Sequence, residues 1–273
     1  MDFSVLVPVY KKEKPQNLYI ALQSIINQSL KPSEILIVKD GLLTPELDQV
    51  IAKLENEHKE IVKVLAFAKN RGLGLALKDG ILECRYEFIA RMDSDDISYP
   101  DRFRKQLDYL KNNPEMALVG SWISEFSKSP AEPDTLTKLP VTHEEIVQYA
   151  KRRNPLRHQT VVFRKSAVLA SGNYRTFLWF EDYDLWIRII KSGYKVANIP
   201  EVLVNVRADV NMFARRGGFA YWQQDMKFQC YLYKIDYISF WIFLSNCIIR
   251  TAMRILPNGV RTYCYRAFLR KRI

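Results

Sequence analysis

The sequence predicts an α/β protein with a parallel sheet covered by helices on both faces. Three observations predict this fold. Short apolar runs alternate with segments of helical periodicity, four such units fit into about the first hundred residues, and polar residues follow the apolar runs. The chain has 273 residues, of which 48% are hydrophobic, so it can form one large domain or one domain with an appendage. Its charged fraction of 26% excludes wholesale disorder.

The first expected strand covers residues 3–10, whose sequence FSVLVPVY is typical of a buried strand. The alternation continues with helices over 17–28, 47–54 and 73–82 and strands over 35–38, 62–67 and 87–92. In such sheets the ligand crevice lies beyond the carboxyl ends of the strands. One crevice is therefore expected to collect the residues at those ends, which are Tyr10, Asp40, Asn70–Arg71 and an acidic cluster that begins at Asp93.

The pattern becomes less regular after residue 102. We expect a polar loop over 127–138, a helix over 144–151, a strand over 160–163 and a helix that begins at Glu181–Asp182. The segment from about Gly217 is helical in pattern and rich in aromatic residues. We therefore expect one unit over residues 1–216 and a second, helical unit over 217–273.

The C-terminal helical segment is a candidate for membrane association. Its longest uncharged stretch, residues 237–249, has thirteen residues, fewer than the roughly 20 needed to cross a bilayer. On a helical wheel Asn246, Arg250 and Arg254 share one face, and the apolar residues lie elsewhere. Such a helix is expected to lie in a membrane interface, with the basic tail drawn to anionic headgroups. The alternative is a helix packed on the protein's own core with a solvated tail.

Charge and cysteine content bear on partners and compartment. The chain carries 41 basic and 30 acidic residues, a net charge of +11. Seven basic residues and no acid lie in residues 250–273, so the rest of the chain carries 11 − 7 = +4. The four cysteines have no metal-type spacing and are expected as free thiols. The N-terminus lacks the basic and apolar regions of a signal peptide, which predicts a cytoplasmic protein.

Two acidic motifs could carry chemistry. Asp93 and Asp95 follow a buried strand and could hold a hard divalent cation, although acids also favour a helix start there. Glu181 and Asp182 open a helix whose apolar face would fix them to the core, which suits a general base. The helix dipole alone also favours acids in that first turn. His158 is more typical of a structural histidine.

The order of the motifs identifies a family. Along the chain these are VPVY, Asp40-Gly41, Asn70-Arg71-Gly72, ARMDSDD, NPLRHQTVVFR and FEDYDLW. As a set they resemble the family 2 glycosyltransferases, especially the bacterial enzymes that build O-antigen, capsule and exopolysaccharide. The likeness covers roughly residues 1–218, including the run of residues 215–218. It implies a GT-A fold, a Rossmann-like nucleotide-diphospho-sugar transferase domain over 1–216, followed by a membrane-associating segment over 217–273.

The resemblance also implies roles for residues on the nucleotide side. Pro8 and Tyr10 match the residues that line the nucleobase pocket, and Asp40 matches the acid that reads uracil. Arg71 matches the loop that covers the nucleotide, and Asp93 would contact the ribose. The family often has two acids before the turn that Asp40 opens, whereas Lys39 precedes Asp40 and Leu42 follows Gly41 here, which puts the details of nucleobase contact in doubt.

The remaining implied roles concern the reaction. Asp95, with Asp93, would coordinate manganese or magnesium on the diphosphate. Asp182 matches the general base that deprotonates the acceptor hydroxyl, and Glu181 would support it. The roles of His158 and of residues 215–216 near acceptor or phosphate stay open.

The implied activity is inverting, metal-dependent hexose transfer, with glucose or galactose favoured, from a UDP-sugar to a polyprenyl-diphosphate-linked oligosaccharide. Such an enzyme would lie on the cytoplasmic face of the bacterial inner membrane, against its anionic surface, and would bind no nucleic acid.

Three other classes of protein fit the sequence less well. A sugar-nucleotide pyrophosphorylase would carry a Gly-rich loop after the first strand, where residues 11–15 contain no glycine. A basic nucleic-acid-binding protein could use the charged tail, but the tail's basic residues are interleaved with apolar ones, which fits a membrane surface better. A catalytically inactive sugar-nucleotide-binding scaffold is disfavoured because Asp93, Asp95 and Asp182 are all present.

Overall fold

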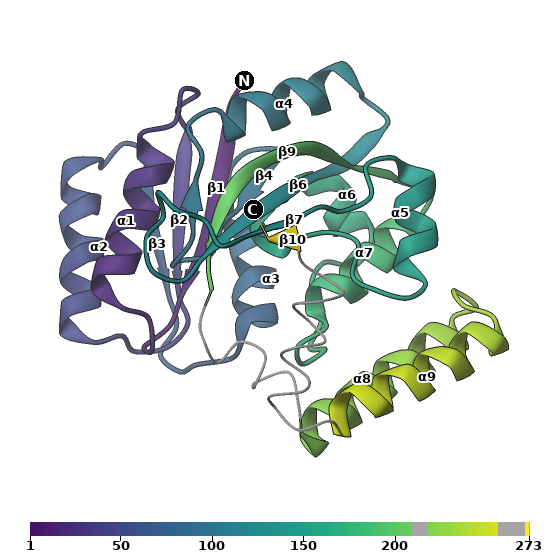
Figure 1. Ribbon diagram of the computed structural model, residues 1–273. Helices are drawn as coiled ribbons and strands as arrows, with labels where there is room; N and C mark the ends of the chain where they lie inside the picture. Colours follow the sequence, from purple (N-terminus) through teal and green to yellow (C-terminus); the bar gives the residue numbers. More distant parts are fainter. Residues whose placement is uncertain (209–217, 256–270, 273) are drawn as a thin grey trace.

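The computed structural model describes residues 1–208, 218–255 and 271–272. A mixed sheet runs through the molecule, helices cover both of its faces, and two C-terminal helices extend from one end (Figure 1). The Arg215–Arg216 pair, Cys264 and most of the basic tail lie outside the described residues. The predicted division at residue 216 falls there as well and stays a prediction.

The strands run β1 Phe3–Val9, β2 Glu34–Lys39, β3 Val62–Ala66, β4 Phe88–Arg91, β5 Ile97–Ser98, β6 Met116–Phe126, β7 Thr135–Thr137, β8 Val162–Arg164, β9 Lys195–Arg207 and β10 Lys271–Arg272. The helices run α1 Pro15–Ile26, α2 Pro45–Glu57, α3 Leu73–Glu83, α4 Arg102–Asn112, α5 His143–Ala150, α6 Lys165–Ala170, α7 Glu181–Lys191, α8 Phe219–Lys234 and α9 Phe240–Ile255, and a 3₁₀ turn, η1, covers His158–Thr160.

The first half of the chain forms the expected parallel sheet. Strands β3, β2, β1 and β4 lie side by side in that order and are all parallel. The chain moves outward from β1 to β3 and then returns to the other side of β1, so the direction of winding reverses beside β1. The carboxyl ends of β1, β2 and β4 meet at this point, which is where open α/β sheets bind ligands.

Each face of the sheet has its own apolar core because successive strand residues point to opposite faces. Val5 and Val7 of β1 pack with α1, α2 and α4, whereas Leu6 packs with α3, α6 and α7. Gly80 of α3 lets this helix approach β1 closely, since a Cβ there would lie 2.6 Å from the Leu6 side chain.

Two expectations need correction. The strand expected over 160–163 begins later, at Val162, because the Thr160 hydroxyl donates to the carbonyl of Arg157 (2.8 Å) and closes η1. The loop expected over 127–138 ends in a short strand, β7. It pairs antiparallel with β6, and the Thr135 hydroxyl donates to Glu125 across the pair (2.8 Å).

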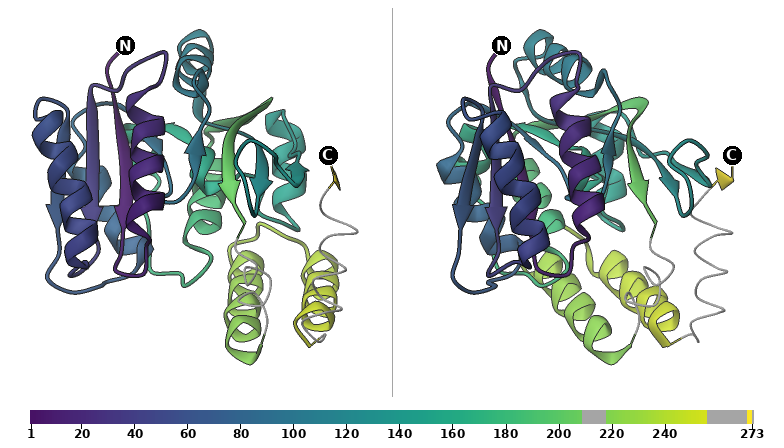
Figure 2. Two further views of the ribbon diagram at one scale, coloured as in Figure 1. Left: turned by 60° about the vertical axis from the view of Figure 1, so that its left-hand side comes forward. Right: turned by 90° about the vertical axis from the view of Figure 1, so that its left-hand side faces the viewer.

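Helices α8 and α9 form an antiparallel hairpin that extends from the sheet domain (Figure 2), and α8 packs on α7. Phe228 and Leu232 of α8 are buried against Tyr183 and Ile187 of α7. Within the described chain, no helix is both long and apolar enough to cross a membrane.

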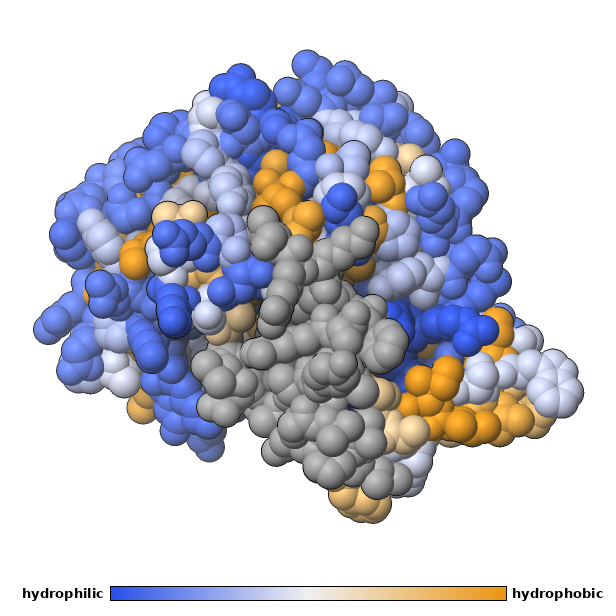
Figure 3. Space-filling model, in the orientation of Figure 1, coloured by the Kyte–Doolittle hydropathy of each residue, from blue (hydrophilic) through white to orange (hydrophobic). Residues whose placement is uncertain are grey.

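The hairpin buries polar residues and exposes apolar ones. Asn246, Arg250 and Arg254 share one face as expected, but that face turns toward α8. Both arginines pair with the fully buried Asp225 (2.6 and 2.9 Å), and Asn246 donates to Gln229 (2.9 Å). The outward face carries apolar side chains that gather along the hairpin at the lower right of Figure 3, among them Phe240, Trp241, Leu244, Ile248 and Ile249. Trp241 is 75% exposed.

Candidate active site

The end of β1 supplies the first two predicted site residues. Pro8 is buried and pairs in register with Val38 of β2. Tyr10 follows the strand with its ring exposed at the carboxyl edge. Tyr10 is therefore available to a ligand at this edge, and Pro8 lies in the backbone beneath it.

Asp40 organises the loop that follows β3. Its carboxylate accepts hydrogen bonds from the Asn70 side chain (2.9 Å) and from the backbone N–H groups of Arg71 (2.7 Å) and Gly72 (3.0 Å). Gly41 permits this contact because its φ is +91° and a Cβ there would lie 2.6 Å from the Asn70 nitrogen. Two loops from different strands are thus joined at the crevice, and the role of Asp40 in reading uracil stays a prediction.

Arg71 lies on the exposed rim of this loop. Its guanidinium pairs with Asp79 (2.8 Å) and stacks over the Phe67 ring. Both partners lie on neighbouring elements, so the side chain is held at the edge of the crevice, and its covering role stays a prediction.

The acidic cluster follows β4. Asp93, Asp95 and Asp96 each bring one carboxylate oxygen to within 4.8 Å of the others. The backbone N–H of Arg207, at the end of β9, donates to Asp96 (2.9 Å), and the Ser94 hydroxyl donates to Glu13 (2.8 Å). Contacts from β9 and from the loop after β1 therefore fix the shape of the turn.

Arg91, the last residue of β4, is a buried cation beneath this cluster. It forms an ion pair with Asp93, while its Nε and Nη1 have no hydrogen-bond partner among the described residues. Burial raises the pKa of Asp95, Asp96, Glu181 and Asp182, and the positive charge of Arg91 partly opposes that rise at each of them. Both acidic motifs therefore lie within electrostatic reach of one guanidinium.

Burial dominates the titration of the cluster. Removal from water, and then the charges of Asp93 and Glu13, raise the pKa of Asp95 to about 7. Burial and the neighbouring carboxylates raise the pKa of Asp96 well above its usual value. Arg91 does not offset these effects.

The donor set fits a hard divalent cation. Three carboxylates bring oxygen atoms to within 4.8 Å of one another, and oxygen ligands are those that magnesium and manganese prefer. Asp93 and Asp95 would hold such an ion, and Asp96 adds a third oxygen ligand absent from the prediction.

Metal binding should depend on pH in a direction that the raised pKa of Asp95 fixes. The folded state favours the protonated form of Asp95. Without metal, the free energy of unfolding therefore falls as pH rises from the ordinary pKa of an aspartate, 3.8, to about 7. A cation needs the ionised carboxylate. We therefore expect manganese to raise the melting temperature more at pH 8 than at pH 6, measured by thermal unfolding. Equal shifts at both pH values, or an equal shift in Asp95→Asn, would contradict this assignment.

Helix α7 positions the second acidic pair. Asp182 accepts hydrogen bonds from the Asn154 side chain (2.6 Å) and from the Tyr183 N–H (2.7 Å). Burial raises the pKa of Asp182, and those two bonds oppose the rise. Burial and the charge of Asp182 raise the pKa of Glu181 to about 7. A carboxylate held by two donors with a raised pKa has the properties of a general base.

His158 is half-buried and packs against buried aromatic residues of the core. Its Nε2 is 2.7 Å from the Tyr174 hydroxyl, and its ring packs edge-on to Trp186. Burial, and then the nearby charge of Arg91, lower its pKa well below the usual value. The imidazole is therefore neutral near pH 7 and supports the fold.

Several residues at the site have no role among those predicted from the motifs. Asn154 lies in the NPLRHQ motif and orients Asp182, and Arg91 precedes Met92-Asp93. Trp179 lies two residues before α7 and has a φ of +67°. Its ring stacks on that of Tyr221 of α8, with 4.9 Å between the ring centroids. The signal for Asn154 and Arg91 in the sequence is their place inside the NPLRHQTVVFR and ARMDSDD motifs.

Comparison with known proteins decides the family. A model described as glycosyl transferase family 2 matches residues 4–170. The chain belongs to glycosyl transferase family 2. The glycosyltransferase is 38% identical to the amylovoran biosynthesis glycosyltransferase AmsE of Erwinia amylovora, over 96% of this chain and 97% of that protein. It is 36% identical to the UDP-Gal:alpha-D-GlcNAc-diphosphoundecaprenol beta-1,3-galactosyltransferase of Escherichia coli, over 98% and 97%. The family resemblance drawn from the motifs is confirmed.

Solved structures confirm the GT-A-like α/β fold. A mannosyltransferase from Pyrobaculum calidifontis, in complex with GDP-Man and Mn²⁺, has a TM-score of 0.65 at 15% identity, covering 97% of this chain and 75% of that one. S. aureus TarS 1-349, in complex with UDP-GlcNAc, has a TM-score of 0.62 at 13% identity, covering 96% and 69%. The glycosyltransferase covers 39% of a longer TarS chain. At these identities the likeness concerns the fold alone.

Proposed function

We propose that this glycosyltransferase transfers one hexose from a UDP-sugar to a polyprenyl-diphosphate-linked oligosaccharide during surface-polysaccharide synthesis, with inversion at the anomeric carbon. The observation that carries the proposal is that the carboxylate cluster after β4 and the Asp182 carboxylate held by Asn154 both lie within electrostatic reach of buried Arg91. The names of the Erwinia and Escherichia relatives support the polysaccharide role and the lipid-linked acceptor. Galactose is the first donor to test because the Escherichia relative uses UDP-Gal.

The Glu181–Asp182 pair activates the acceptor in this reaction. Asp182, oriented by Asn154, accepts the proton of the acceptor hydroxyl as that oxygen attacks the anomeric carbon. Glu181 beside it supports the base. A single displacement from the face opposite the leaving group converts an α-linked UDP-sugar into a β-linked product.

The nucleotide lies on the other side of the crevice in this proposal. Tyr10 and Pro8 line the base, Asp40 reads uracil, and Arg71 covers the nucleotide from the rim. Asp93 contacts the ribose and, with Asp95, holds manganese or magnesium. That cation, when bound, supplies positive charge that stabilises the leaving diphosphate.

We also propose that the α8–α9 hairpin rests on the cytoplasmic face of the inner membrane. Ile248 and Ile249 are 61% and 55% exposed, although both lie on a helix whose polar side chains are buried. A hairpin with its apolar face outward fits the boundary between headgroups and acyl chains. This placement would bring the site to the lipid-linked acceptor.

The exposed apolar face predicts the behaviour of a surface variant. Replacing Trp241, Ile248 and Ile249 together by glutamine should reduce recovery on anionic phospholipid vesicles about ten-fold or more, since each loses about 1.5–3 kcal/mol of burial. Cosedimentation measures this. The matched control replaces Tyr19, Leu82 and Leu169, which are exposed on other helices. Equal vesicle binding by both triple variants would contradict the membrane placement.

UDP release tests the reaction. Purified protein is mixed with UDP-galactose, UDP-glucose or their N-acetyl forms, with and without manganese, and with a lipid-diphosphate-linked GlcNAc acceptor. We expect metal-dependent UDP release that needs the acceptor and favours one hexose. If UDP binds but no donor reacts, the inactive sugar-nucleotide-binding scaffold becomes the better assignment.

A further inference from the structure

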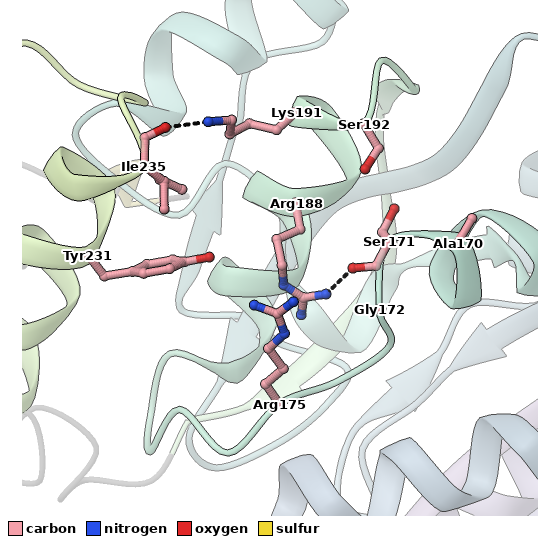
Figure 4. Close-up of a pocket in the computed structure, with 9 residues that line it drawn as sticks. All are labelled: Ala170, Ser171, Gly172, Arg175, Arg188, Lys191, Ser192, Tyr231 and Ile235. Carbon is pink, nitrogen blue, oxygen red and sulfur yellow. Dashed lines mark hydrogen bonds between the residues drawn. The ribbon is translucent and has the colours of Figure 1, made fainter.

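A basic cavity of about 400 Å³ lies at the far end of α7, away from the acidic motifs. The end of α6, the loop after it and the end of α8 form its walls (Figure 4). Arg175, Arg188 and Lys191 bring three cationic side chains to it, and Tyr231 of α8 lines the opposite side. A methyl-sized group on Gly172 would lie 3.4 Å from nitrogens of both Arg175 and Arg188, so the two guanidinium groups converge.

The cavity retains positive charge. Arg188 is paired with buried Asp184 (2.8 Å) and also donates to the carbonyls of Ser171 and Asn173. Lys191 donates to the carbonyl of Ile235, which does not neutralise it. Arg175 forms no ion pair with any residue in the described part of the chain. Three cations and one carboxylate leave 3 − 1 = +2, which suits a doubly charged anion.

An apolar groove of about 530 Å³ adjoins the basic cavity, and Tyr231 lines both. Phe177 forms one wall, and Trp222, Met226 and Cys230 recur along α8 at helical spacing to form the other. The groove also carries the cations Lys227 and Lys234. The two spaces together match an amphiphile with an anionic head and an apolar chain.

The basic cavity is aligned with the acidic pair. Arg188 follows Glu181 by seven residues, so the two lie on the same face of α7, two turns or about 10.5 Å apart. A Cβ on Gly74 would lie 3.0 Å from the Arg175 carbonyl and 3.4 Å from the Glu181 Cβ, so the cavity loop also adjoins Glu181. An acceptor held by its phosphates in the cavity could extend a sugar toward the carboxylates.

We propose that this composite surface binds the lipid acceptor, with its diphosphate between Arg175 and Lys191 and the start of its polyprenyl chain in the groove along α8. The inference rests on the proposed function, since it assigns the acceptor's place in that reaction. Charge complementarity selects the diphosphate over a neutral headgroup. Arg175 and Lys191 are positioning residues that bind the acceptor away from the reacting atoms.

Three acceptors separate the contributions of the head and the chain. They are a GlcNAc-diphosphate with a long alkyl chain, the same compound with a methyl group in place of the chain, and an alkyl GlcNAc glycoside without phosphate. Arg175→Gln should raise the KM for both diphosphates about ten-fold, and the Kd measured by calorimetry should rise by the same factor. The KM for the glycoside, and kcat, should stay unchanged. Cys230→Gln should raise KM several-fold for the long-chain diphosphate alone. Arg85→Gln, an exposed arginine elsewhere, is the control.

The outcomes distinguish this inference from the proposed function. If the wild-type protein transfers sugar and Arg175→Gln has the same KM values as the wild type, the proposed acceptor site is wrong and the proposed function stands. Diphosphate binding that depends on Arg175 without any transfer supports the site and overturns the function. If Arg175→Gln loses anionic-vesicle binding while its affinity for the methyl diphosphate is unchanged, the cavity binds bilayer phosphate and the proposal is wrong.

Discussion

Asp182→Asn is expected to lower kcat by about 10²–10⁴-fold, the usual contribution of a general base, while UDP affinity stays unchanged. Asparagine keeps the shape of the side chain, and its single carbonyl oxygen can still accept one of the two hydrogen bonds that Asn154 and the Tyr183 N–H donate to the separate carboxylate oxygens of Asp182. It cannot take the proton from the acceptor hydroxyl. The measurement is UDP release under saturating donor and acceptor, with UDP affinity followed by calorimetry.

A matched carboxylate substitution controls for the loss of charge. Asp101→Asn removes an exposed acid that hydrogen-bonds Ser29 at the surface, and it should leave turnover unchanged. Wild-type turnover in Asp182→Asn would remove the base assignment. Loss of UDP binding in that variant would show instead that the substitution had disturbed the crevice.

Asp95→Asn should abolish the metal-dependent part of UDP binding. Asp95 is one of three carboxylates within 4.8 Å, and its amide counterpart is a much weaker ligand for a hard cation. The loss of a ligand also removes the charge that stabilises the leaving diphosphate, so we expect turnover to fall by at least about 10²-fold. UDP titrations with manganese and with a chelator measure the first effect.

The substitution should leave the fold intact, because it removes a buried charge whose pKa is already raised to about 7. We therefore expect Asp95→Asn to melt at or above the wild-type temperature when no metal is present. Manganese-dependent UDP binding equal to wild type would show that Asp93 and Asp96 suffice and that Asp95 is not a metal ligand.

Local patterns in the sequence were sufficient for the parallel half of the fold. The apolar runs fixed β1 to β4, and the polar residues after them predicted the crevice that now holds Tyr10, Asp40 and Asp93. These features are visible because strand and helix periods are local properties. The extent of β7 and β8 depends on pairing with β6, which lies elsewhere in the sequence.

The supporting residues depend on contacts that local patterns do not contain. Asn154 meets Asp182 across 28 residues, and Arg207 meets Asp96 across 111. A helical wheel grouped Arg250 and Arg254 correctly but could not show that this face turns inward, because their partner Asp225 lies on another helix. A buried carboxylate on another helix can therefore draw the polar face of a surface helix inward and leave its apolar face exposed.

The anomeric configuration of the product is the most direct test of a single displacement by an Asp182-activated hydroxyl. The protein is incubated with an α-linked UDP-hexose, manganese and the lipid-diphosphate-linked GlcNAc acceptor, and the product is examined by proton NMR. We expect one added hexose with the large anomeric coupling of a β-linked galactose or glucose. An α-linked product would contradict the mechanism, since retention requires a second displacement or a different attack geometry.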